Sequence, residues 1–158
     1  MPARPYLLLD VDGPLNPYRA KSVPPGYAFH DIQEGEKTWK LLLNQQHGTE
    51  LNALGTSYEL VWATSWEHGA NRLIAPLLGL PELPVIVWPE GIRSRVDQIS
   101  WKSRHISEWV GERRFAWVDD EVNSFDQAYL KSQGLVLPID ASRGLAAEDF
   151  AVLRAWAE

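Results

Sequence analysis

Short apolar runs alternate with amphipathic stretches along the whole chain, and this alternation predicts strands that are each followed by a helix. Five apolar runs are too short for buried helices and are bounded by turn residues, which is typical of strands buried on both faces. The predicted strands cover residues 6–9, 58–63, 84–88, 114–118 and 135–139. Helical spacing, capping residues and terminal glycines predict helices over residues 48–54, 67–78, 100–110, 123–132 and 146–156.

Strands that alternate with helices are joined by right-handed crossovers and form a mostly parallel sheet with helices on both faces. We therefore expect an α/β fold with three α/β/α layers, Rossmann-like, with a five-stranded sheet in a single domain over residues 1–158. Residues 14–45 are rich in proline, glycine and mixed polar residues and interrupt this pattern. We expect a small flap there, with a β-hairpin that pairs residues 39–43 with residues near 27–32.

The overall composition fits one globular domain, because 45% of the 158 residues are hydrophobic and 23% are charged. A formal net charge of -6 and a pI near 5.2 argue against a broad basic surface, so we expect no stable nucleic-acid complex. The absence of cysteine excludes disulfides, thiolate zinc sites and cysteine nucleophiles. Neither a long apolar run nor the cationic start of a signal peptide is present, and we expect a cytoplasmic protein without a membrane partner. The oligomeric state stays open.

The first predicted strand ends in a polar loop, Asp10-Val11-Asp12-Gly13-Pro14. Side chains two positions apart on an extended segment point to the same side, so Asp10 and Asp12 can address one metal ion or one substrate atom. In open α/β sheets, ligands bind outside the carboxyl ends of the strands, which is where both acids are expected. An Asp-x-Asp-Gly loop alone is also compatible with a simple solvated turn.

Two further predicted strands end in polar residues. Thr64 and Ser65 follow the second strand, and Asp119 and Asp120 follow the fourth. Each pair could also have a purely structural role, because Thr and Ser commonly cap helices and Asp commonly begins turns. The carboxyl ends of parallel strands share one edge of a sheet, however, so these residues are expected to meet the two acids of the first loop.

The order of these residues resembles the four motifs of the haloacid dehalogenase-like (HAD) superfamily: Asp10-Val11-Asp12-Gly13, then Thr64, then Lys102 at a helix start, then Asp119-Asp120. The resemblance covers nearly the whole chain. Two segments, Trp62-Ala63-Thr64-Ser65-Trp66-Glu67 and Trp117-Val118-Asp119-Asp120-Glu121, further resemble the small HAD domains of Swiss-army-knife RNA-repair proteins. The resemblance implies a HAD fold and a phosphohydrolase (phosphatase) activity on a phosphomonoester.

The same resemblance assigns catalytic roles to Asp10, Asp12 and Lys102. Asp10 would attack the phosphorus atom and form an aspartyl-phosphate. Asp12 would protonate the leaving oxygen and then take a proton from the attacking water, which requires a pKa above that of an isolated aspartate. Lys102 would neutralise charge in the transition state. Thr64 and Ser65 would bind phosphoryl oxygens together with backbone N–H groups at a helix start.

A Mg²⁺ cofactor is also implied, and the residue types agree with it. Carboxylates at one strand edge repel one another unless a cation is bound, and an all-oxygen site suits Mg²⁺. Asp10, the backbone carbonyl of Asp12 and Asp120 would be the protein ligands. Asp119 would be either a further ligand or a group that supports the others. The four histidines show no metal-ligand spacing.

Other activities remain compatible with parts of the pattern. A haloacid dehalogenase uses the same nucleophile but needs neither a metal nor an acid at the position of Asp12. A mutase or another HAD phosphotransferase would normally need a larger cap, and a serine hydrolase built on Ser65 and His68 lacks a Gly-x-Ser-x-Gly elbow. Lys131 and Arg104 are alternatives to the proposed lysine. A catalytically decayed HAD domain that serves as a binding module is the non-enzymatic alternative.

The substrate is left open among phosphorylated small molecules such as nucleotides, nucleic-acid ends and phosphoproteins. Cations in the flap and beyond the third strand are candidates for a local basic rim: Arg19, Lys21, Lys37, Lys40, Arg93 and Arg95. Eight tryptophans are more than a core of this size usually needs. Trp66, directly after the phosphate loop, is the one expected to contact the substrate.

Overall fold

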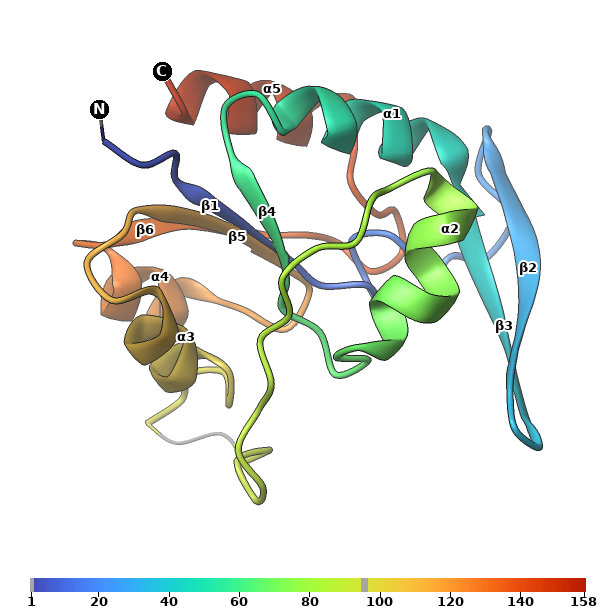
Figure 1. The fold of residues 1–158 in the computed structure, drawn as a ribbon, viewed down its shortest axis with the longest axis horizontal. Coiled ribbons are helices and arrows are strands. Elements are labelled where there is room, and N and C mark those ends of the chain that lie inside the picture. The colour runs from blue at the N-terminus through green and yellow to red at the C-terminus, as the bar shows by residue number, and fades with distance from the viewer. Residues whose placement is uncertain (1, 95–96) are drawn as a thin grey trace.

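Four parallel strands form the central sheet of the structure, a computed structural model that describes residues 2–94 and 97–158. In spatial order they are β4 (Glu59–Trp62), β1 (Tyr6–Leu9), β5 (Phe115–Asp119) and β6 (Gly134–Pro138). Figure 1 shows this sheet running through the molecule. β1 lies between β4 and β5, with Leu9 opposite both Trp62 and Val118. The residues that follow these three strands therefore emerge together at one edge of the sheet.

The sheet has a hydrophobic core on each face, and successive residues of β1 contribute to different cores. Leu7 and Leu9 belong to the larger core and Leu8 to the smaller one, and all three are fully buried. The first face is covered by α1 (Gln45–Leu54), α2 (Ala75–Leu78) and α5 (Ala147–Trp156), and the second by α3 (Ser103–Val110) and α4 (Ser124–Leu130). Figure 1 shows α1 and α5 on one side of the sheet and α3 and α4 on the other, so the predicted three layers are confirmed.

The helices lie close to their predicted positions, with a difference in the segment after β4. A bend and turns occupy residues 64–68, and a π-helix, η1 (Ala70–Ile74), continues directly into α2. Gly79 then ends α2 in the left-handed conformation with φ 68°, as a terminal glycine predicts. Ser100 caps the turn before α3 rather than the helix itself, because its Oγ accepts from the Lys102 amide at 3.2 Å. No helix among the described residues is long and apolar enough to cross a membrane.

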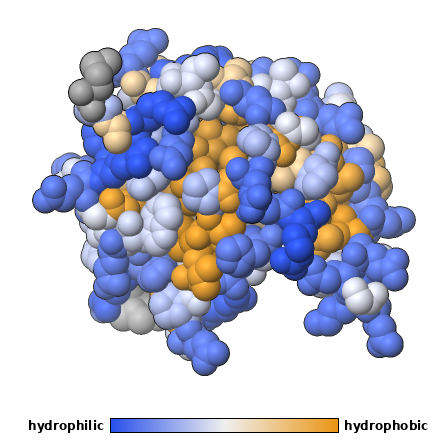
Figure 2. Space-filling model, viewed as in Figure 1, coloured by the Kyte–Doolittle hydropathy of each residue, from blue (hydrophilic) through white to orange (hydrophobic). Residues whose placement is uncertain are grey.

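The prediction that residues 84–88 form a fifth strand of the sheet is wrong. Among the residues that the structure describes, this segment makes a single β-bridge to the sheet, between Val85 and Trp62. Pro84 begins the segment and has no N–H to donate to β4. The amide of Trp88 donates instead to Glu67 Oε2 at 2.9 Å. Figure 2 shows apolar side chains gathered over β4 and this crossing segment.

The flap contains the predicted β-hairpin. β2 (Tyr27–Glu34) pairs antiparallel with β3 (Lys37–Asn44), and Ile32 lies opposite Trp39. Both strands are longer than predicted, and Leu41 of β3 belongs to the larger of the two hydrophobic cores. Figure 1 shows β3 beside α2. The hairpin is therefore packed against the domain at the edge where the motif residues emerge.

Candidate active site

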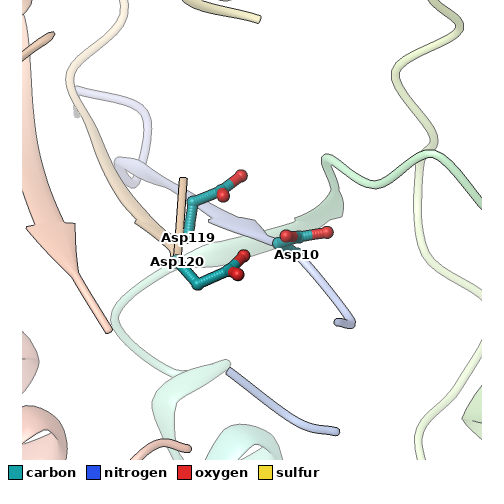
Figure 3. A group of neighbouring side chains, drawn as sticks. All are labelled: Asp10, Asp119 and Asp120. Carbon is teal, nitrogen blue, oxygen red and sulfur yellow. The ribbon is translucent and has the colours of Figure 1, made fainter. Parts of the chain in front are cut away.

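Three carboxylates from neighbouring strands meet at the edge of the sheet where the strands end. Asp10 follows β1, Asp119 is the last residue of β5, and Asp120 comes next. One oxygen from each of them lies within 4.8 Å of the others. Figure 3 shows the three side chains side by side. Their meeting follows from the register, because the parallel pairing of Leu9 with Val118 places the next residues of both strands together.

Lys102 brings a positive charge into this cluster from the turn before α3. Its side chain is 6% exposed, and Nζ lies 2.7 Å from Asp119 Oδ2 and 3.3 Å from Asp10 Oδ1. Nζ also donates to the carbonyl oxygen of the residue after β4 at 2.9 Å. The lysine thereby joins the ends of three strands. The alternatives for this role, Arg104 and Lys131, are both exposed.

Two tryptophans that the sequence did not single out cover the lysine. Lys102 Nζ lies 5.7 Å from the ring centroid of Trp88 and 5.4 Å from that of Trp101. The two rings meet edge to face, with 5.1 Å between their centroids. Trp88 Nε1 donates to the carbonyl oxygen of Thr64 at 3.0 Å, which fixes the ring beside the turn after β4. Such rings attract a cation and keep water away from it, which strengthens the attraction between the lysine and its carboxylates.

Burial and charge shift the pKa values within the cluster. The pKa of Asp10 lies well above its ordinary value because burial penalises the carboxylate and Asp119 repels it, although Lys102 offsets part of the shift. Burial also raises the pKa of Asp120. Burial alone lowers the pKa of Lys102, but the attraction of the two carboxylates beside it outweighs this, and the net pKa is raised. The single charge of Lys102 does not neutralise three carboxylates. A bound cation would stabilise the negative charge that remains.

Asp119 is hydrogen-bonded at both of its carboxylate oxygens. Its Oδ2 accepts a hydrogen bond from Lys102 at 2.7 Å, and its Oδ1 accepts one from the backbone N–H of Glu121 at 2.9 Å. Its side chain is fully buried. Each oxygen thus accepts one hydrogen bond, and the carboxylate holds the lysine in place.

Asp10 and Asp120 each have one oxygen held by a donor. Asp10 Oδ1 accepts from the backbone N–H of Val11 at 2.9 Å, and Asp120 Oδ2 accepts from the hydroxyl of Tyr18 at 2.5 Å. Within the described residues, no other side chain donates to the second oxygen of either carboxylate. A pair of carboxylate oxygens at a strand edge fits a hard divalent cation such as Mg²⁺, which prefers oxygen ligands.

The carboxylate of Asp12 is held away from this cluster. Asn16 Nδ2 donates to its Oδ1 at 2.9 Å, and Trp66 Nε1 donates to its Oδ2 at 3.1 Å. Asn16 also accepts from the backbone N–H of Leu42 at 3.0 Å, so the loop is tied to β3 of the hairpin. Trp66 was expected near the substrate, and it orients Asp12. Asn16 gave no signal in the sequence, because an asparagine in a turn is common.

Thr64 and Ser65 differ in accessibility. Thr64 is fully buried, and its Oγ1 accepts from the backbone N–H of Trp66 at 3.2 Å. Ser65 is exposed and lines an open cleft. Thr64 therefore shapes the turn after β4, whereas Ser65 is accessible from the cleft.

The cleft has a volume of about 620 Å³ and opens on the Asp12 side of the site. Its walls come from β3 of the hairpin and from the turn and π-helix after β4. Lys37 and Lys40 of the predicted basic rim line this cleft. Ligand pockets commonly have volumes of roughly 300–1,000 Å³, so the cleft is large enough for an organic leaving group.

Three other cations of the predicted rim, Arg19, Lys21 and Arg93, do not line the cleft. The guanidinium of Arg93 lies 5.3 Å from the ring centroid of Trp101, and that of Arg19 lies 5.7 Å from the ring centroid of Tyr18. Lys21 is exposed in the loop before the hairpin. The remaining predicted member, Arg95, lies outside the described residues.

Comparison with known families agrees with this geometry. The family model described as the HAD domain in Swiss Army Knife RNA repair proteins matches residues 6–150, from β1 to within α5. No match was found among curated proteins or among solved structures. The matched range contains every residue of the cluster and both sides of the cleft. The chain therefore belongs to the family of HAD domains found in Swiss Army Knife RNA repair proteins.

Proposed function

We propose that this chain is a Mg²⁺-dependent phosphatase that hydrolyses a phosphomonoester through an aspartyl-phosphate on Asp10. The observation that carries the proposal is the buried lysine between two carboxylates: Lys102 Nζ lies 3.3 Å from Asp10 Oδ1 and 2.7 Å from Asp119 Oδ2. This arrangement leaves Asp10 one free oxygen and places a fixed positive charge beside it. Membership of a HAD family supports a hydrolase of this general class.

Asp10 has the geometry of a positioned nucleophile. Its Oδ1 is held by the Val11 amide and approached by Lys102, so Oδ2 is the oxygen that would attack phosphorus. The bond between this oxygen and phosphorus forms as the bond between phosphorus and the leaving oxygen breaks. Lys102 neutralises charge that gathers on the phosphoryl oxygens. The attack by water then releases inorganic phosphate and regenerates the carboxylate.

Asp12 would move the protons in both steps. Its carboxylate lines the cleft, where the leaving group must depart, and hydrogen bonds from Asn16 and Trp66 fix its orientation. In its protonated form it gives a proton to the leaving oxygen, and as a carboxylate it takes one from the attacking water. The Trp66 donor comes from the turn after β4, so the Asp12 carboxylate is held by a distant segment, unlike that of a simple solvated turn.

Asp10, Asp120 and the backbone carbonyl of Asp12 would hold the Mg²⁺ ion, with Asp119 supporting the cluster through Lys102. When bound, the ion supplies positive charge that offsets the repulsion among the acids and the phosphoryl oxygens. The raised pKa of Asp10 fits this role, because a buried nucleophile that must be ionised needs a cationic partner.

Hydrolysis of a generic aryl phosphate tests the proposal. Purified protein with Mg²⁺ should release phosphate, Asp10→Asn should abolish turnover, and excess chelator should stop the reaction until Mg²⁺ is restored. Asp31→Asn is the matched control, because Asp31 is an exposed aspartate on β2 outside the cluster. Turnover that survives Asp10→Asn or excess chelator contradicts the mechanism. Binding of phosphorylated ligands without any turnover would instead identify a decayed HAD domain.

A further inference from the structure

In the proposed mechanism, the cleft beside Asp12 is on the leaving-group side of the site. A general acid must lie within hydrogen-bond reach of the oxygen that it protonates. Asp12 lines the cleft together with Asn16 and Ser65, whereas Asp10, Asp119 and the rest of the buried cluster do not. The alcohol part of the phosphomonoester therefore extends into this cleft, and the side chains of the cleft identify its chemistry.

Two tryptophans form an aromatic corner in the cleft. Trp39 on β3 and Trp66 in the turn after β4 meet edge to face, with 5.2 Å between ring centroids and 63° between ring planes. Trp66 is fixed by its hydrogen bond to Asp12, so the corner has a defined position relative to the general acid. Leu41 and Leu73 add apolar wall. An aromatic and apolar surface of this kind stacks planar rings without regard to their hydrogen-bonding edges.

Cations lie along the same wall, although the net charge of the chain is -6. Lys37, Trp39 and Leu41 are two residues apart on β3, so they share one face of the hairpin. Lys40 and Arg72 also line the cleft, but Lys40 Nζ lies 5.5 Å from the ring centroid of Phe29. Arg72 is paired with Glu34 at 2.7 Å, but Lys37 has no ion pair among the residues that the structure describes. A positive charge is thus available beside the aromatic corner.

We propose that this cleft is a nucleotide subsite, in which the base next to the scissile phosphate stacks on Trp39 and a neighbouring phosphate pairs with Lys37. The proposal deepens the phosphatase function and rests on it. A planar ring joined to more than one phosphate is the chemistry that an aromatic corner with adjacent cations recognises. A phosphoserine leaving group offers neither a ring nor a second anion to this wall. The subsite fits a free nucleotide or the phosphorylated end of a single strand.

Three classes of substrate distinguish a free nucleotide from the phosphorylated end of a strand. The first is a base-free sugar phosphate, the second is a nucleoside monophosphate, and the third is a short oligonucleotide with a phosphate at its 5′ or 3′ end. For wild-type protein, kcat/KM should be higher for the substrates with a base than for the base-free one. If the oligonucleotide also exceeds the mononucleotide, the occupant is a strand end, and if the two are equal, the occupant is a free nucleotide.

Trp39→Ala is the decisive variant. The ratio of kcat/KM for the nucleotide over that for the base-free sugar phosphate should fall about tenfold, the loss expected for one stacked base. Trp39→Phe should retain most of the ratio because it keeps a ring. Phe125→Ala is the control, because Phe125 is an aromatic residue on α4, is 47% exposed and is not part of the cleft wall. An equal loss on both substrates would show that Trp39 only supports the fold and would overturn the subsite.

Lys37→Ala tests the charge in the same assay. For an oligonucleotide substrate it should raise KM and reduce the slope of log KM against log salt concentration by about 0.7, the effect of one lost phosphate contact to a single strand. An unchanged slope contradicts a phosphate contact by Lys37.

Direct binding keeps the subsite separate from catalysis. Titration of the protein with a nucleotide and with the base-free sugar phosphate should show tighter binding of the nucleotide, and Trp39→Ala should remove the difference. This result would support the subsite even if no phosphate ester is hydrolysed, an outcome that rejects only the phosphatase. Equal binding of the two ligands by wild-type protein would overturn the subsite and leave the phosphatase intact.

Discussion

Gly13 and Asp120 are packed so closely that the loop after β1 has no room for a side chain at this position. A Cβ atom on Gly13 would lie 2.6 Å from both Cβ and Cγ of Asp120, and the glycine has φ 104°. Left-handed backbone of this kind is available to glycine at little cost, whereas other residues are strained in it. The glycine of the first motif therefore sets the position of an acid of the last motif.

Gly13→Ala should reduce turnover about a hundredfold, because a shift of about 1 Å in a catalytic group costs that much. The backbone strain should also lower stability by about 1–3 kcal/mol. Gly79→Ala is the control, since Gly79 has φ 68° and no atom within 4 Å of its Cβ position. It should lower stability with little effect on kcat, as measured by steady-state kinetics and denaturant unfolding. Equal kcat in the two variants would show that the contact with Asp120 has no role.

Lys102→Met should destabilise the protein by about 3–5 kcal/mol, because it leaves two buried carboxylates without their cation. Turnover should fall with it, since the variant lacks the charge beside the phosphoryl group. Lys131→Met, at an exposed position, should change the free energy of unfolding by less than about 0.5 kcal/mol. Urea unfolding of both variants measures the difference. A Lys102 variant as stable and active as wild type would contradict the role of this ion-pair network.

Asp12→Asn should affect substrates according to their leaving groups. A general acid accelerates a reaction by about 10²–10⁴-fold, and it matters most where the leaving oxygen is strongly basic. The variant should therefore lose much more activity on an alkyl phosphate than on an aryl phosphate whose leaving group needs no proton. Its apparent Mg²⁺ affinity should change little, because the carboxylate faces Asn16 and Trp66. A uniform loss on all substrates together with weakened Mg²⁺ binding would make Asp12 a carboxylate ligand.

Tyr18→Phe should raise the Mg²⁺ concentration needed for half-maximal activity by about 10–100-fold, the usual effect of losing a group that orients a metal ligand. The Tyr18 hydroxyl donates to Asp120 Oδ2 at 2.5 Å. Burial and the hydrogen bond to Asp120 raise the pKa of Tyr18 to about 12, so the hydroxyl remains a donor at neutral pH. Tyr129→Phe is the control at a tyrosine that is 46% exposed on α4. The same Mg²⁺ dependence in both variants would rule out this orienting role.

His47 should make the fold sensitive to mild acid. Burial lowers its pKa from the ordinary value of 6.5, partly offset by the Leu145 carbonyl and Glu50. Its Nε2 lies 3.0 Å from the carbonyl oxygen of Leu145, and its buried Nδ1 has no partner among the described residues. The unfolded chain therefore binds the proton more readily, so this stability is present above about pH 6.5 and is lost as the pH falls. The free energy of unfolding should drop more between pH 7.5 and 5.5 in wild-type protein than in His47→Gln, and equal drops would contradict the assignment.

The sequence predicted that the acids of the motifs would meet, because their signals are local. Each motif stands where an apolar run stops, and parallel pairing brings such ends together without further information, as Asp10 and Asp119 show. The hairpin was also predicted, because proline, glycine and alternating residues mark it within one segment. The local pattern of residues 84–88, in contrast, predicted a strand that is not part of the sheet. These residues have the apolar content of a strand. The segment alone does not show that the Trp88 amide donates to Glu67 instead of to a neighbouring strand.

The supporting residues could not be predicted, because their partners are distant in sequence. Tyr18 and Asp120 are 102 residues apart, and nothing in either segment marks the other. Asn16 joins the first loop to β3, which required the hairpin to be placed first. The tryptophans around Lys102 come from a crossing segment and a turn whose positions depend on the packing of the smaller core. Such contacts follow from the fold and not from a motif.

Mass spectrometry of protein quenched in acid during turnover tests the central claim most directly. The account predicts a phosphoryl group on the peptide that contains Asp10. This modification should depend on Mg²⁺ and substrate and be absent from Asp10→Asn. A phosphoryl group on another residue, or steady turnover with no phosphorylated protein in wild type or in a slowed Asp12→Asn variant, would contradict the account.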